Sequence, residues 1–380
     1  NISFSLTFSS MPGPFNTHNY ITDQVVPCVG ATFLITFLPL VIIQIVCTQL
    51  FELVAPNYPS FLKPIPALIG SSFVKVKEDS YMVLWVIWLA ICLPLFLTFM
   101  STFTLTWKVA LFYNICRIGP MYTNFAHVYT LSHMEVHRQY QLFTTKNPFM
   151  KCVFNMWIGL FHGVVPGTFT HSHVNNHHKY DNDINDVYST AGYRRDSVWS
   201  FCRYIVVWFA YATNFSTFYD MIKQGEYRKV FEVFLGSCYY VAFILLNMSL
   251  FGTKFALVTV VYPLIEGNIL LALVNYTWHI FIEEGNDYVN SLTILNGENF
   301  IFSEEYHVVH HYAPGFHHSR YKSVFEKNIE KYDIVFQHTN LFELGITAIL
   351  CNYKRLGTMV KDPPDDVEEI LKKRLRATLW

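Results

Sequence analysis

Charged residues are scarce in this chain of 380 residues. Asp, Glu, Lys and Arg together make up 14% of it and hydrophobic residues make up 52%, whereas a soluble domain averages about 25% charged residues. The formal net charge of -1 argues against a nucleic-acid partner. The eight cysteines form no CxxC pair, so neither a zinc ribbon nor a disulfide framework is indicated. The scarcity of charge indicates an integral membrane protein.

Four apolar runs are long enough to cross a bilayer, which takes about 20 helical residues. The runs at about 25–51 and 81–107 contain no Asp, Glu, Lys or Arg. The runs at about 231–250 and 255–275 are separated by a short turn-like segment, so we expect them to form a hairpin. A fifth apolar stretch, 198–218, contains one Arg and many aromatic residues. This composition favours an interfacial or steeply tilted helix over a span.

Two polar blocks, about 108–197 and 281–380, contain most of the Lys and Arg. If four helices span, both blocks lie on one side of the membrane, and the excess of basic residues places that side in the cytoplasm or its organelle equivalent. We therefore expect a multi-pass membrane protein. Whether its membrane is the endoplasmic reticulum or that of another organelle stays open.

Histidine is concentrated in three short motifs in these polar blocks. The first reads HMEVH, the second HVNNHH and the third HVVHH, and their histidines are His133, His137, His173, His177, His178, His307, His310 and His311. On a helix, His133 and His137 share a face. His177 and His178 point in different directions, so that they reach two different metal ions. So many buried imidazoles without a metal would need other polar partners, and we interpret the three motifs as metal ligands.

The other histidines are interpreted as ordinary ones. This applies to single residues such as His18, His127, His162 and His338, and surface histidines are favoured over an additional metal pair for His317 and His318. The three motifs supply eight imidazoles and no cysteine, which is enough for two ions that each keep an open position. Such sites suit non-haem iron and oxygen chemistry, while copper, manganese and zinc satisfy the same ligands.

The motifs HxxxH and HxxxHH after one expected hairpin, and HxxHH after a second, resemble those of the membrane-bound di-iron desaturase and hydroxylase superfamily. The resemblance covers residues from about 30 to 340. It implies two Fe ions, O2 and a substrate with a fatty acyl or other long alkyl chain. It also implies a ninth ligand near the end of the fourth span, where His279 lies, and a metal-bound water held by Asn275. The implied architecture is a single all-α domain over residues 1–380, with about four transmembrane helices in two hairpins. A same-side helical cap, 108–197 and 281–350, would hold the dinuclear centre, and the tail at 351–380 would be peripheral.

The branch of the superfamily is not decided by the motifs. The three residues between His173 and His177 are similar to the alkane 1-monooxygenase branch, whereas the third motif is similar to sphingolipid and fatty acyl desaturases. Both desaturation and hydroxylation therefore stay open. The sequence has no GxGxxG fingerprint and no haem-binding module, so a separate electron donor of the cytochrome b5, ferredoxin or rubredoxin type is implied.

Acidic residues near the motifs are candidates to hold the outer nitrogen of a metal-bound imidazole, with solvated loop charges as the alternative. They are Glu135, Asp181, Asp183, Glu283, Glu284, Asp287 and Glu304. Glu266 lies within an expected span, where a carboxylate needs a partner.

Two other functional classes fit a histidine-rich membrane protein. A metal transporter would place its ligands within the spans near the midplane, whereas eight of the nine candidate imidazoles lie outside the expected spans. A catalytically retired accessory subunit of a larger membrane complex would be recognised by missing ligands, and none is missing. Metal analysis of the purified protein distinguishes an enzyme from such a subunit.

Overall fold

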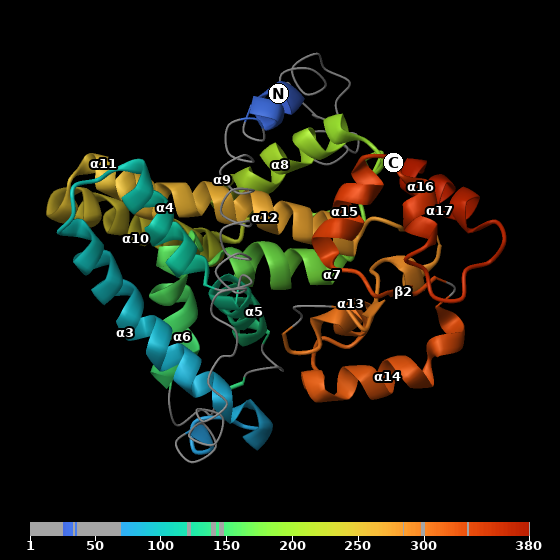
Figure 1. Cartoon of the computed structure of the whole chain (residues 1–380), viewed down its shortest axis with the longest axis horizontal. Coiled ribbons are helices and arrows are strands. Elements are labelled where there is room, and N and C mark those ends of the chain that lie inside the picture. Colours follow the sequence, from blue (N-terminus) through green and yellow to red (C-terminus); the bar gives the residue numbers. More distant parts are fainter. Residues whose placement is uncertain are drawn as a thin grey trace, which may run out of the picture.

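The structure is a computed structural model, which describes residues 26–32, 35, 70–119, 123–137, 142–143, 148–283, 285–297, 301–332 and 334–379. Nearly all regular structure in these residues is helical, as expected from the sequence. Figure 1 shows long helices gathered in one part of the molecule and shorter helices in another.

The second expected span is helix α3, Tyr81–Ser101, which continues from the 3-10 turn η3, Lys77–Ser80. It ends six residues before the expected boundary at 107. The reason is a new helix, α4, Trp107–Ile118, whose first turn is capped by the Thr106 side chain accepting a hydrogen bond from the Val109 N–H. Such a cap satisfies an amide that has no partner within the helix.

The hairpin expected near the middle of the chain is present. Helix α10, Tyr227–Phe251, ends at Gly252, whose φ of 86° is accessible to glycine at no steric cost. The chain then returns as one helical run, Thr253–Trp278. Its parts are α11, Thr253–Ala256, the π-helical η7, Leu257–Val261, and α12, Tyr262–Trp278. Helix α10 packs on α11 and η7, and Figure 1 shows α11 at the turn.

Three helical runs in the described residues are long and apolar enough to cross a membrane: 77–101, 227–251 and 253–278. The first expected span, 25–51, lies almost wholly outside the described residues, apart from a helical stretch at 26–32. The face of α3 away from the core is apolar and exposed, with Trp88, Ile91, Leu95 and Phe99 between 53% and 62% exposed. These residues recur every three or four positions, so they form one stripe that lipid can cover.

The stretch at 198–218 is not one long helix. Helix α8, Val198–Ala212, has 15 residues, and α9, Phe215–Lys223, begins after Asn214, whose φ is 67°. Helix α8 packs on α12 with Tyr204, Tyr211 and other residues buried. Since 15 residues rise only about 22 Å as a helix, α8 is shorter than the hydrocarbon core.

The remaining helices of the described residues are short. They are α5 (Thr123–Val136), α6 (Pro148–Met156), η5 (Ile158–His162), η6 (Phe169–His177), α7 (His178–Tyr180), η8 (Asp287–Val289), η9 (Glu304–Tyr306), α13 (His307–Tyr312), η10 (His318–Arg320), α14 (Tyr321–Lys327), η11 (Ile329–Lys331), α15 (Leu341–Ile349), α16 (Tyr353–Gly357) and α17 (Val367–Arg376). Strands β1 (Ile294–Leu295) and β2 (Phe336–Gln337) pair in parallel, with Ile294 opposite Phe336.

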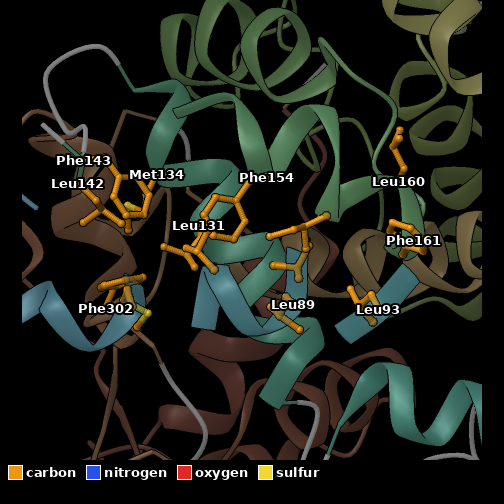
Figure 2. Packing of buried hydrophobic residues seen from close by; sticks show 14 of the residues in the cluster. Leu89, Leu93, Leu131, Met134, Leu142, Phe143, Phe154, Leu160, Phe161 and Phe302 are labelled. Carbon is orange, nitrogen blue, oxygen red and sulfur yellow. The ribbon is translucent and has the colours of Figure 1, made fainter. Parts of the chain in front are cut away.

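One hydrophobic core joins α3 to α5 and α6. Figure 2 shows Leu89 of α3 near Leu131 of α5 and Phe154 of α6, and Leu93 of α3 near Phe161 of η5. Each of these side chains is at most 5% exposed. The core therefore fixes α5, which carries the first histidine motif, against a helix of membrane length.

The C-terminal segment packs more closely than the peripheral tail expected from the sequence. Val367, Leu371 and Leu375 recur at four-residue intervals on one face of α17 and are buried. The buried Arg195 guanidinium donates to the carbonyl oxygens of Ile280, Thr190 and Tyr193 and to that of Arg374 in α17. The apolar stripe and this guanidinium hold α17 against the segment that follows the second motif.

Glu266, the acidic residue within a span, has a partner. Its carboxylate pairs with the Arg117 guanidinium of α4, and both side chains are at most 1% exposed. Arg117 also donates to the Asn114 side chain. The buried charge is thus compensated, as its position within the span requires.

Candidate metal centre

Four separate segments bring nine imidazoles together. His133 and His137 come from α5 and its end, and His173, His177 and His178 from η6 and α7. His279 follows α12, and His307, His310 and His311 lie on α13. Eight of them fall into two groups whose nitrogen atoms lie within 4.8 Å of one another: His133, His137, His173, His178 and His310 in the first, and His177, His279 and His311 in the second. His177 and His178 thus lie in different groups, as their directions on a helix predict.

In the first group, four Nε2 atoms form a closed ring. The Nε2 of His133 lies 2.9 Å from the Nε2 of His173 and 2.9 Å from the Nε2 of His310. The Nε2 of His178 lies 2.9 Å from that of His173 and 3.1 Å from that of His310. A planar ring with such sides has its corners about 2.1 Å from its centre, which is the length of a bond between a metal and an imidazole nitrogen. Each Nε2 carries either one proton or one lone pair, so hydrogen bonds alone satisfy at most two of the four contacts.

The second group has a similar geometry. The Nε2 of His177 lies 3.2 Å from the Nε2 of His279, and the His311 ring lies 4.9 Å and 4.6 Å from the rings of these two residues, between centroids. His307 lies beside this group without belonging to it. Its ring stacks on Trp278 at 4.5 Å and lies 4.8 Å from that of His311.

Asn275 is buried near the second group, one helical turn before His279. Its amide nitrogen donates to the Tyr188 carbonyl at 3.1 Å and to the Tyr204 hydroxyl at 2.7 Å. These contacts fix the amide between α12 and the segment after the second motif.

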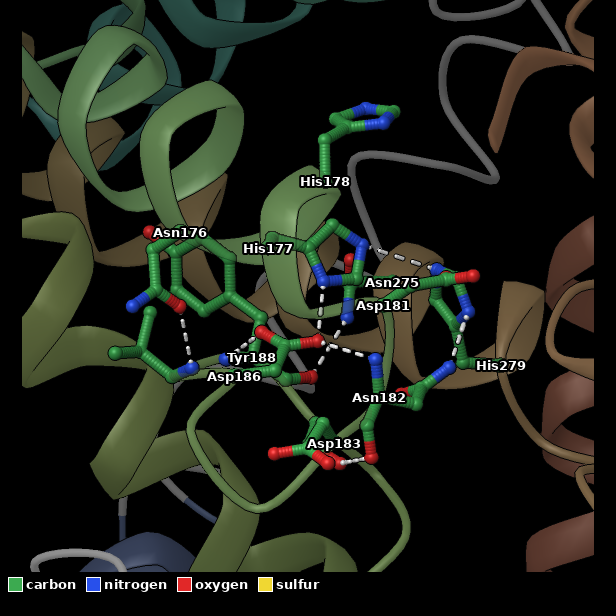
Figure 3. A network of polar contacts seen from close by, with 12 residues as sticks. Asn176, His177, His178, Asp181, Asn182, Asp183, Asp186, Tyr188, Asn275 and His279 are labelled. Carbon is green, nitrogen blue, oxygen red and sulfur yellow. Dashed lines mark hydrogen bonds and ion pairs between the residues drawn. The ribbon is translucent and has the colours of Figure 1, made fainter. Parts of the chain in front are cut away.

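The outer nitrogens of four of the imidazoles bind polar groups, which turns their Nε2 atoms inward. In the second group, His177 Nδ1 lies 2.7 Å from Asp186 Oδ2. His279 Nδ1 lies 2.6 Å from the Asn290 carbonyl oxygen. His311 Nδ1 lies 3.0 Å from Asp181 Oδ1. Figure 3 shows Asp186 beneath His177, and Asn182 reaching His279. In the first group, His310 Nδ1 lies 3.0 Å from the Tyr321 hydroxyl. Such contacts select the tautomer whose Nε2 lone pair faces a metal.

Some carboxylates proposed for this role have it and others do not. Asp181 contacts His311, and the Glu304 carboxylate lies 3.5 Å from His133 Nδ1 and 3.4 Å from His307 Nδ1. Asp183 instead accepts from Asn185, and Glu283 pairs with Arg374. Glu135 accepts from the Leu142 N–H, and Glu284 lies outside the described residues.

Sequence reasoning did not find four of the groups that orient the imidazoles: Asp186, Asn182, Asn290 and Tyr321. Asp186 lies nine residues after His177, in a segment without a repeating pattern. Its place is set by backbone N–H groups, because Oδ2 accepts from Asn182 N–H at 2.9 Å and Oδ1 from Tyr188 N–H at 2.8 Å. The acidic content of this segment was the only available signal.

Burial favours the neutral form of seven of the nine imidazoles by lowering their pKa. Burial, followed by the charges of neighbouring imidazoles, lowers the pKa well below 6.5 for His137, His173, His178, His279, His307 and His310. Burial also lowers the pKa of His311, where Asp181 opposes the effect. For Glu304, burial acts to raise the pKa, but contacts with His133 and nearby imidazoles outweigh it and lower it. Neutral imidazoles beside ionised carboxylates are the protonation states that bind a cation.

The donor set fits a pair of metal ions. Besides the ring of Nε2 atoms, His137 Nε2 and His311 Nε2 are buried and make no hydrogen bond within the described residues. A buried polar atom without a partner is costly. A cation in each group would give His137 Nε2 and His311 Nε2 a partner. In the first group it would also bind the Nε2 lone pairs of the ring that hydrogen bonds cannot all satisfy.

The ordinary histidines behave as expected where the structure describes them. His127 stacks on Trp85, and burial lowers the pKa of His162 to about 3 while its Nε2 lies 3.2 Å from the Arg117 carbonyl. His338 is exposed and His18 lies outside the described residues. His317 and His318 differ from expectation, because both contact the buried Asp79.

A small apolar cavity of about 30 Å³ reaches the first group at His173. Its wall consists mainly of apolar and aromatic side chains: Tyr129, Val164, Val165, Phe169, Trp208 and Leu271. This lining is typical of sites for apolar ligands, whereas the volume is about that of one water molecule. An alkyl chain could enter here only if the walls moved apart.

A family model described as fatty acid desaturase matches residues 105–340 of the chain. The match includes all nine imidazoles and Asn275. No curated protein and no solved structure matches the chain.

Proposed function

Because the chain belongs to the fatty acid desaturase family, we propose that it is a membrane-bound di-iron oxidoreductase. It uses O2 to oxidise an unactivated C–H bond of a fatty acyl chain or another long alkyl lipid. The observation that carries this proposal is the convergence of Nε2 atoms from four segments on two points, beside an apolar cavity that reaches one of them.

The two groups of imidazoles divide the ligands between two ions. His133, His137, His173, His178 and His310 hold one ion, and His177, His279 and His311 hold the other, with His307 joining the second. Asn275 holds a water on this second ion. In support, four of the five Nε2 atoms of the first group lie at the corners of a ring of metal-binding size, and His307 lies against His311.

The chain's own groups position the chemistry that the irons supply. Two iron ions bound to these imidazoles would activate O2 for cleavage of a C–H bond. The imidazole rings are held in place through their Nδ1 atoms, which contact the carboxylates of Asp186, Asp181 and Glu304. The cavity walls exclude water and fix which carbon lies nearest the centre, so the wall decides whether the product is an alkene or an alcohol.

The substrate and the electrons come from different sources. An alkyl chain from the membrane lipids is recognised by apolar contacts with residues such as Phe169 and Leu271. Electrons are delivered by a separate protein of the cytochrome b5, ferredoxin or rubredoxin type, because the sequence has no nucleotide-binding fingerprint.

Expression of the chain in a host with a known lipid profile tests the proposal. Mass spectrometry should detect new alkenes or alcohols, and His310→Ala should abolish them. The matched control is His338→Asn, which changes an exposed histidine and should leave the product unchanged. Product that persists in the His310→Ala variant would refute the assignment of the centre.

Metal analysis separates the enzyme from the main alternative, an accessory subunit that has lost catalysis. The enzyme should contain about two iron atoms per chain. A well-folded protein that binds no metal at these imidazoles would favour the accessory role.

A further inference from the structure

A third cluster of metal-ligating side chains shares no residue with the nine imidazoles. It consists of Asp79, His317 and His318. Asp79 lies in η3, directly before the membrane-length helix α3, while the two histidines follow α13, the helix of the third motif. The Asp79 side chain is 1% exposed, and the histidine side chains are 21% and 14% exposed. The cluster thus has a buried carboxylate and two imidazoles that solvent reaches.

Each of the two imidazoles points its Nε2 atom at the Asp79 carboxylate. His317 Nε2 lies 2.7 Å from Asp79 Oδ2, and His318 Nε2 lies 2.7 Å from Asp79 Oδ1. Consecutive residues of a regular element point in different directions. Here His317 is extended, with ψ of 138°, and the turn η10 begins at His318, so the two rings lie 4.3 Å apart between centroids. This local change of conformation lets both rings face one carboxylate.

The outer nitrogen of His317 has a partner suited to metal binding. Its Nδ1 lies 2.9 Å from the Ser319 hydroxyl oxygen. A metal-bound imidazole usually donates its other N–H to an oxygen, and the Ser319 hydroxyl is such an acceptor. The Ser319 backbone N–H also points at this Nδ1, at 3.4 Å, so the two Ser319 groups favour opposite tautomers. In the tautomer whose Nδ1 proton is donated to the closer hydroxyl, the Nε2 lone pair points toward Asp79 and can bind a cation.

We propose that Asp79, His317 and His318 form a third metal site, which binds one divalent cation of the zinc type. The donor set is two imidazole nitrogens and one carboxylate oxygen, and the three donor atoms lie within 4.8 Å of one another. Zinc binds such ligands at about 2.0–2.2 Å, and a water takes its fourth position.

The consequence of this site is a link between distant parts of the chain. Asp79 and His318 are 239 residues apart in sequence. The cation would tie the start of α3 to the loop that follows His310 and His311. Because a structural metal contributes its binding free energy to folding, the site would stabilise the third motif without taking part in the oxidation.

Zinc binding by the full chain in detergent tests this site. The protein is stripped with a chelator and equilibrated with Zn²⁺, and bound zinc is measured by mass spectrometry. The wild type should bind one more zinc per chain than Asp79→Asn, which keeps the size of the side chain and removes its charge. His338→Asn should bind as much zinc as the wild type.

The difference between wild type and variant is the readout, so the result does not depend on how many ions the nine imidazoles hold or on any lipid product. Size-exclusion chromatography checks folding. If Asp79→Asn aggregates, His318→Gln replaces it and should also lose one zinc, because this imidazole is a ligand at the rim of the site. Equal zinc content in the wild type and a folded variant would overturn the proposal and leave a hydrogen-bonded His–Asp–His contact.

Discussion

Replacing Asp186 by Asn tests how the protein orients a metal-binding imidazole. The Asp186 side chain is fully buried. Its Oδ2 lies 2.7 Å from His177 Nδ1 and accepts from the Asn182 N–H, and its Oδ1 accepts from the Tyr188 N–H. All three neighbours need an oxygen. In either orientation, the amide of Asn places an NH2 group against at least one of these N–H groups.

The expected effect has two parts. A buried donor left without an acceptor costs about 1–3 kcal/mol of folding free energy. In addition, loss of an outer partner of a metal-bound His typically lowers metal affinity by about 10- to 100-fold, which corresponds to about 1.4–2.7 kcal/mol. Both effects arise although Asp186 itself binds no metal.

The assay is a competition titration of the purified protein, in which a chelator of known affinity competes for Zn²⁺ or Fe²⁺, together with thermal unfolding in the same detergent. Asp183→Asn is the matched control, because Asp183 lies in the same segment and is exposed, and the hydrogen bonds described for its side chain go to Asn185. Equal metal affinity in the two variants would refute the idea that Asp186 holds His177 in its binding orientation.

Three further perturbations test other parts of the structure. Arg117→Ala removes the partner of the buried Glu266 and should cost about 3–5 kcal/mol, seen as a lower unfolding temperature, whereas Arg228→Ala should have little effect because Arg228 is 93% exposed. Leu271→Trp narrows the apolar cavity and should shift products toward shorter chains or different positions without loss of bound metal; an unchanged product pattern would show that the cavity does not hold the substrate. For Asp196, burial acts to raise the pKa but hydrogen bonds from Tyr353 and Arg376 outweigh it, so that its pKa in the folded protein lies below 3.8. A lowered pKa stabilises the fold at pH values above 3.8, and this stabilisation is lost as the pH falls toward the pKa of the folded state. The wild type should therefore lose more unfolding free energy than Asp196→Asn between about pH 5 and pH 3, and parallel pH profiles would contradict this.

Much of the helical framework could be predicted because membrane helices depend on length and composition. The hairpin expected at 231–250 and 255–275 is present, but α10 begins at Tyr227. The sequence boundary missed this first turn because Arg228 and Lys229 interrupt the apolar composition without interrupting the helix. By contrast, the end of α3 at Ser101 depends on the Thr106 cap, which is a local hydrogen bond within an uncharged run.

The same distinction applies to the candidate site. The partition of His177 and His178 between two groups follows from the angle between adjacent residues, so the sequence predicted it. The groups that hold Nδ1 atoms, such as Asp186 and the Asn290 carbonyl, lie in irregular segments where no period relates position to direction. The contact of Asp79 with His317 and His318 joins residues more than 230 positions apart, and only the folded chain brings them together.

The hydrogen bonds of the Arg195 guanidinium, called here the Arg195 clasp, affect how truncating mutations of this protein would be interpreted. The guanidinium joins the carbonyl after His279, the segment after the second motif and helix α17. A premature stop codon before Val367 would delete no imidazole, yet it would remove the Arg374 carbonyl and the leucines that cover this clasp. Such a nonsense allele would therefore present as a failure to retain metal, and a screen limited to the histidine motifs would overlook it.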